Sequence, residues 1–255
     1  MWSDIMWFDT LVFVVAVVSA SIASVAGFGI GSLLTPTLGL SMGTKIAVAA
    51  VSVPHLVGTA MRFWSLRDAI DTRTLWRFGV ASAAGGLGGA LAHGWIDSPW
   101  LSVVFGVVLL FVAMSEFSGL SRRMEFHGRV AWIAGALSGA LGGLVGNQGG
   151  IRSAALLGFD LPKRAFVATA TATGLMVDAA RMPVYAATVG SAMRAIWPTI
   201  LLATAGVMVG TLFGGRLLKR IPDLLFRKIV AGLLALLGLV MLLQGLNGPD
   251  DQATR

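Results

Sequence analysis

The sequence contains no cysteine, and only 12% of its 255 residues are charged. Without cysteine, the chain can form no disulfide, bind no metal through thiolates and carry out no thiol redox chemistry. Hydrophobic residues make up 56% of the chain, and the mean hydropathy is +0.83. A soluble domain of this size cannot bury so much apolar surface, so the composition predicts an integral membrane protein that contacts the lipid bilayer.

Motifs that would indicate several other functions are also missing. No GxxxxGK[ST] phosphate-binding motif occurs, so ATP hydrolysis by this chain is not expected. No GxSxG motif occurs, and His55, His93 and His127 are widely separated, so neither catalysis nor a metal site is expected. The net charge of +7 is attributed to cytoplasmic loops rather than to a nucleic-acid surface. No cofactor and no nucleic-acid partner are predicted.

Long apolar stretches recur along the chain, and several reach the roughly 17–25 residues of a spanning helix once their flanks are included. The first stretch is not expected to be a signal peptide, because Asp4 and Asp9 precede it and no basic residue does. Short connections between the stretches leave no room for a separate soluble domain. The stretches are 11–27, 46–60, 78–92, 101–114, 130–145, 165–177, 196–213 and 229–243.

The sequence also matches itself at an offset of 119 residues, which later grows to 121. Glycines and basic residues stay in register over this match, which predicts two homologous halves, 1–120 and 121–255. The coinciding pairs include Gly27 and Gly146, Gly31 and Gly150, Gly39 and Gly158, Lys45 and Arg164, Arg62 and Arg181, Gly85 and Gly206, and Gly89 and Gly210.

The basic residues are concentrated in alternate connections, which the positive-inside rule places in the cytoplasm. Two of these connections flank a single apolar segment, 130–158, so this segment must enter the membrane and return to the same side. It is therefore predicted to be a re-entrant hairpin with GNQGG at its tip. The basic residues are Arg62, Arg67, Arg73, Arg77, Arg122, Arg123, Arg129, Lys163, Arg164, Arg216, Lys219, Arg220, Arg227 and Lys228.

By homology, residues 9–40 are predicted to form a hairpin that enters from the opposite side. The predicted fold is an all-α integral membrane protein of two inverted repeats, each with one re-entrant helical hairpin and three transmembrane helices. Both termini are expected to be periplasmic, and eight ordinary crossings are the alternative. The predicted spans are 44–66, 75–95 and 99–118 in the first half, and 163–187, 196–215 and 223–244 in the second.

Each hairpin is expected to restart as a short helix near the middle of the membrane, around Ser32 and Ile151. A helix start exposes unpaired N–H groups and the positive end of its dipole, which favours an anion. Glycine lets the backbone approach such a ligand, although helix packing would also explain these glycines. The predicted substrate-binding residues are Gly27, Phe28, Gly29, Gly31, Ser32, Gly146, Asn147, Gln148, Gly149, Gly150 and Arg152.

Charged residues within the apolar segments are the second group of candidates, because burying a charge in a membrane is costly. Arg152 is expected to hold an oxyanion bidentately, or alternatively to reach the cytoplasmic interface. Asp178 and Arg181 lie three residues apart and are expected to pair. Together with His55 and Arg62, they are assigned to gating or coupling, with a purely structural role as the alternative.

The glycine-rich motifs resemble those of the TauE/SafE sulfite exporter family. GFGIGSLLTP, residues 27–36, is similar to the first family motif, and GNQGGIRSAALLGFDLPKRAFVATATATG, residues 146–174, looks like its second copy. Ile30 and Ala155 depart from the family pattern, as does Arg152, which stands where an apolar residue is expected. The resemblance implies export of sulfite or small organosulfonates across a bacterial inner membrane.

The function predicted from the sequence is a secondary transporter for a small organic or inorganic sulfur anion. An anion channel or an uptake carrier on the same scaffold is the alternative, and an intramembrane enzyme is ranked last. The sequence leaves open which anion is carried, the direction of transport, coupling to protons, and whether the chain forms a homo-oligomer.

Overall fold

The computed structural model describes residues 2–26, 29–96, 98–120, 128–146, 161–214 and 223–247, together with positions 152, 156, 159 and 216. Every regular element in these ranges is helical, so the predicted all-α class is confirmed. The α-helices are α1 (Trp2–Ala26), α2 (Ile30–Met42), α3 (Thr44–Leu66), α4 (Thr72–Thr74), α5 (Val80–Trp95), α6 (Ser98–Phe117), α7 (Gly128–Val145), α9 (Lys163–Ala195), α10 (Trp197–Val209) and α12 (Asp223–Leu246). A 3-10 turn, η1 (Arg67–Ala69), and two π-helical turns, η2 (Leu75–Gly79) and η4 (Gly210–Gly214), complete the set.

Several helices have the length and composition of membrane spans. Three stretches, Trp7–Ser24, Thr44–Ala69 and Gly128–Val145, are long and apolar enough to cross a membrane. The stretches Arg164–Ala195 and Trp197–Phe213 form a further candidate, bent by 100° where they meet. The outer surface also carries large exposed apolar side chains, as expected where lipid is the solvent. These include Leu87, Leu91, Phe111, Ile133, Leu137, Leu212, Phe213, Leu236 and Leu239.

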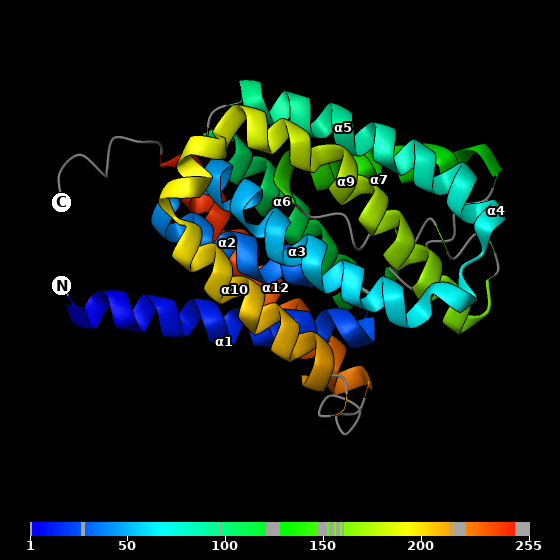
Figure 1. The fold of residues 1–255 in the computed structure, drawn as a ribbon, viewed down its shortest axis with the longest axis horizontal. Coiled ribbons are helices and arrows are strands. Elements are labelled where there is room, and N and C mark those ends of the chain that lie inside the picture. The colour runs from blue at the N-terminus through cyan, green and yellow to red at the C-terminus, as the bar shows by residue number, and fades with distance from the viewer. Residues whose placement is uncertain are drawn as a thin grey trace.

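In Figure 1, the start of α1 and the end of α12 lie at the left end of the molecule, and the turn containing α4 lies at the right. Exposed tryptophans occur near the ends of several helices, which is typical of membrane–water interfaces. They include Trp7 in α1, Trp64 in α3, Trp76 in η2, Trp95 in α5, Trp100 in α6 and Trp197 in α10.

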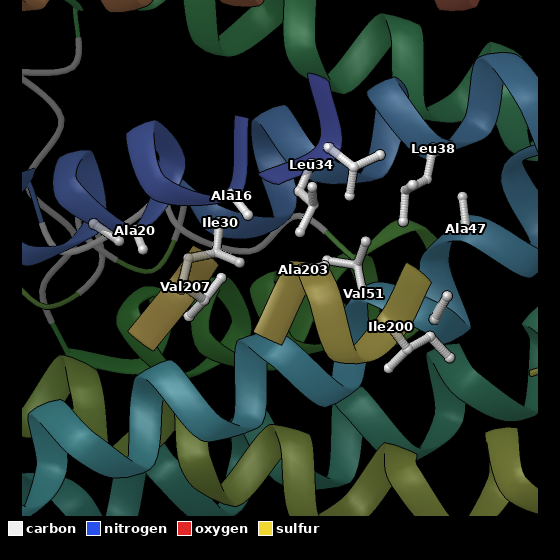
Figure 2. Close-up of a cluster of buried hydrophobic side chains, with 13 residues drawn as sticks. Ala16, Ala20, Ile30, Leu34, Leu38, Ala47, Val51, Ile200, Ala203 and Val207 are labelled. Carbon is white, nitrogen blue, oxygen red and sulfur yellow. The ribbon is translucent and has the colours of Figure 1, made fainter. Parts of the chain in front are cut away.

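Helix α2 is short and enclosed by protein. Its 13 residues extend about 20 Å, less than the roughly 30 Å of the hydrocarbon core. Residues 30–39 are all buried, although Pro36 and polar residues occur among them. Figure 2 shows Ile30 and Leu34 between Ala16 of α1 and Val207 of α10. Because other helices surround it, α2 can end inside the membrane without exposing its backbone to lipid.

Glycines allow three helix pairs to approach closely. Side chains at Gly85 and Gly89 of α5 would overlap the backbone of α7, and side chains at Gly206 of α10 and Gly210 of η4 would overlap the backbone or side chains of α1. Helices α6 and α12 meet in the same way at Gly106 and Gly238. The GxxxG spacing of Gly85/Gly89 and Gly206/Gly210 is typical of such close contacts between helices.

Asp71 caps α4 in the turn between α3 and α5. Its Oδ1 accepts a hydrogen bond of 2.7 Å from the backbone N–H of Thr74, and this bond holds the pKa of the carboxyl below its usual value. We expect Asp71→Ala to lower the free energy of unfolding by about 1 kcal/mol, since one helix-terminal N–H loses its acceptor. Thermal unfolding of the detergent-purified protein measures the change.

Asp68→Ala is the matched control for this prediction. Its carboxylate pairs with Arg164 at 2.8 Å, but both side chains are more than half exposed. Exposed pairs contribute about 0–1 kcal/mol, so removal of Asp68 should have the smaller effect. A larger effect for Asp68 than for Asp71 would contradict this account of the turn.

Candidate functional site

The start of α2 and the end of α7 meet inside the molecule. Gly29 precedes α2 with a φ of 146°, and Gly146 ends α7 with a φ of 74°, both in the region that favours glycine. A side chain at Gly31 would overlap the carbonyl group of Gly146, so the first turn of α2 packs directly on the end of α7. The N-cap residue of α2, Gly29, makes no side-chain capping bond, and Ser32 in the first turn is buried.

The broken end of α7 is capped by side chains from two other helices. The last carbonyl groups of a helix have no partner within the helix. Here the Arg181 Nη1 donates to the Gly142 carbonyl at 2.6 Å, and the Tyr185 hydroxyl donates to the Gly143 carbonyl. His93 of α5 places its Nδ1 2.8 Å from the Leu144 carbonyl oxygen. The end of α7 is thus fixed to α5 and α9.

Asp178 is the centre of a buried network between α3 and α9. Its Oδ1 accepts a hydrogen bond from the Nε of Arg181 at 3.0 Å and lies 2.7 Å from the Nη2 of the same guanidinium, so the predicted pairing of these residues is confirmed. Its Oδ2 lies 2.7 Å from the Nδ1 of His55. Both carboxylate oxygens are therefore engaged, and Arg181 is occupied by Asp178 and by the α7 cap.

Arg152 is almost completely buried, with 4% of its surface exposed. A side chain at Gly174 of α9 would lie 2.8 Å from its Nη1, so the guanidinium packs against this glycine. Its Nε and Nη1 are shielded from solvent and have no hydrogen-bond partner among the described residues. The Arg152 guanidinium is therefore enclosed by protein groups rather than exposed at the surface.

Arg62 of α3 has the same pattern of unpartnered nitrogens. Its Nη2 donates to the hydroxyl of Thr59 at 3.2 Å. Within the part of the chain that the structure describes, its buried Nε and Nη1 have no acceptor. Thr173, beside Gly174 in α9, likewise keeps a buried hydroxyl without a partner there. Unpaired buried donors are costly, so these groups identify a place where a ligand with acceptor atoms would be stabilised.

The charges around this place do not balance. Arg62, Arg152 and Arg181 all interact electrostatically with Asp178, the one carboxylate named in these interactions. Among the described residues, three guanidinium groups against one carboxylate leave an excess of two positive charges when His55 is counted as neutral. No group of three His, Cys, Asp or Glu residues that could hold a metal occurs in the described ranges. The site is therefore suited to an anion.

Six of the predicted substrate-binding residues lie outside the described residues. The other predicted binding residues are all buried. Arg152 lies next to α9, and the rest lie where the start of α2 meets the end of α7: Gly29, Gly31, Ser32 and Gly146. The gating candidates His55, Arg62, Asp178 and Arg181 form one network with contacts between α3 and α9. Those outside the description are Gly27, Phe28, Asn147, Gln148, Gly149 and Gly150.

The sequence interpretation did not identify Tyr185, His93 or Thr59 as members of this network. Tyr185 is the single tyrosine of the chain and follows Asp178 and Arg181 on one face of α9, a signal that could have indicated it. Thr59 coincides with Asp178 at the repeat offset, and its hydroxyl lies 3.4 Å from the Nδ1 of His55. Nothing in the sequence marks His93 as a helix cap.

In a comparison with protein families, the family model described as Sulfite exporter TauE/SafE matches residues 12–241, which is nearly the whole chain. No curated protein and no solved structure matches.

Proposed function

Because the chain belongs to the TauE/SafE sulfite exporter family, we propose that it is a secondary transporter that exports a small sulfur oxyanion, sulfite or an organosulfonate, across a bacterial inner membrane. Membership in this transporter family, together with its apolar helices, makes it a membrane protein. The observation that carries the proposed substrate class is the buried guanidinium of Arg152, which lacks an acceptor among the described residues. An oxyanion would supply the missing acceptor atoms and offset the cost of burying a cation in the membrane.

We further propose that the chain consists of two inverted repeats, 1–120 and 121–255, with both termini in the periplasm. Corresponding helix pairs support this arrangement, since α5 packs on α7 as α10 packs on α1. The corresponding helices α3 and α9 pack on each other, as do α6 and α12. The short, enclosed helix α2 fits the returning arm of a re-entrant hairpin. The substrate would then bind where the two hairpins meet.

Binding measurements with the Arg152→Gln variant test this proposal. We expect wild-type protein to bind sulfite, sulfate, thiosulfate or a small sulfonate, and the variant to bind about 10- to 100-fold more weakly. The reason is that a hydrogen bond to a charged group contributes roughly 1.5–3 kcal/mol. Isothermal titration calorimetry of the detergent-purified protein gives both affinities.

Arg164→Gln is the matched control, because Arg164 is exposed and pairs with Asp68 away from the buried cluster. This variant should bind like wild type. Equal affinities of Arg152→Gln and wild type would remove Arg152 from the site. Efflux of the bound anion from loaded proteoliposomes then tests transport itself, and absence of flux for every anion that binds would refute the proposed function.

A further inference from the structure

A second arginine, Arg62, is partly buried in α3 and has buried nitrogens without a partner among the described residues. His55, Thr59 and Arg62 follow one another at helical spacing on one face of α3, which packs against α9. The hydrogen bond from the Arg62 Nη2 to Thr59 fixes the guanidinium, while its Nε and Nη1 remain buried and without an acceptor in the described ranges. Arg62 is thus held in place by a bond that leaves other donors free for a ligand.

The charges of Arg62 and Arg152 repel each other. Asp178 attracts both groups, but its oxygens are already engaged by Arg181 and His55. Within the described part of the chain, this one carboxylate cannot neutralise three arginines, so the positive charges of Arg62 and Arg152 stay uncompensated there. Such an arrangement is unfavourable unless a further negative charge joins it.

We propose that Arg62 and Arg152 bind the same anion and that this pair selects doubly charged sulfur oxyanions over singly charged ones. The inference rests on the proposed function and narrows its substrate class. A dianion such as sulfate, thiosulfate or fully deprotonated sulfite would balance the excess of two positive charges. Its several oxygen atoms could accept hydrogen bonds from both guanidinium groups and from the Thr173 hydroxyl. Hydrogen bonds to a charged acceptor are stronger than those to a neutral one. A monoanion such as methanesulfonate would leave one charge uncompensated.

The test compares sulfate with methanesulfonate, two probes that share tetrahedral sulfur and differ in charge. We expect wild-type protein to bind sulfate at least about 10-fold more tightly than methanesulfonate, which corresponds to about 1.4 kcal/mol. In Arg62→Gln, sulfate affinity should fall by about 10-fold or more, while methanesulfonate affinity should change much less. The preference for the dianion is therefore expected to be lost.

Arg67→Gln serves as the control, because Arg67 lies at the end of the same helix, is exposed and stacks on Trp64 at 3.8 Å. This variant should keep the wild-type preference. Unchanged sulfate affinity in Arg62→Gln would overturn the inference and leave the transporter proposal intact. Equal affinities of wild type for the two probes would also overturn it, even if Arg62→Gln does not fold. If wild type bound neither these probes nor any other sulfur anion, the proposed function itself would fail.

Discussion

Asp178→Ala is expected to be the most destabilising single substitution considered for this protein. The carboxylate is fully buried and holds both Arg181 and His55. Removing one partner of a buried ion pair typically costs about 3–5 kcal/mol, because the remaining charge is left uncompensated. The excess of positive charge at the site would also increase. The expected result is a large loss of folded protein, measured by size-exclusion chromatography and by thermal unfolding in detergent.

The double variant Asp178→Ala/Arg181→Met separates charge from packing. Replacing both partners of a buried pair by apolar groups is often close to neutral. Arg181 also caps the Gly142 carbonyl, so a part of the stability should remain lost in the double variant. Recovery of most of the folded protein would confirm that the unpaired charge causes the defect. A double variant that is less stable than Asp178→Ala would contradict this explanation.

The second large effect is expected at the glycine contact between α5 and α7. A side chain at Gly89 would overlap the carbonyl group of Ala140, and a helix backbone cannot move aside as a flexible side chain can. We expect Gly89→Ala to lower the free energy of unfolding by about 1–3 kcal/mol or more, because the two helices must separate. Thermal unfolding of the purified variant measures this loss.

The neighbouring Gly88 provides a control, because an alanine there is expected to leave the free energy of unfolding unchanged or to raise it. A side chain at Gly88 would meet nothing within 4 Å. Alanine is favoured over glycine within a helix by roughly 0.5–1 kcal/mol, so Gly88→Ala should be neutral or stabilising. If both variants were equally destabilised, the loss could not be assigned to contact with α7.

Local features of the fold could be predicted from the sequence because they depend on neighbouring residues. The glycines around residue 29 indicated the break before α2, and the spacing of Asp178 and Arg181 indicated their ion pair. The GxxxG spacing in α5 indicated a close helix contact. Helix ends were less accessible: α9 runs to Ala195, but its backbone leaves helical geometry at Val189, two residues after the predicted end of the span at 187. Pro183 does not end this helix.

Contacts between distant residues could not be read from the sequence. The bond between His55 and Asp178 joins residues 123 positions apart, and no local pattern records it. The repeat offset places Thr59 and Asp178 at corresponding positions, but the offset alone does not show that α3 and α9 pack together. Whether the Nε and Nη1 of Arg62 have an acceptor also depends on the surrounding side chains, and these come from several helices.

The caps on α7 restrict how the protein can change shape during a transport cycle. Arg181, Tyr185 and His93 attach the end of this helix to α9 and α5 through buried hydrogen bonds. Breaking all three inside the membrane would be costly, so α5, α7 and α9 should move as one rigid body. Alternating access to the two sides would then require sliding or rocking of this body against α1, α2 and α10. Spectroscopic labels can test this motion. The distance between labels in α7 and α10 should change during the cycle, while the distance between labels in α7 and α5 should stay constant.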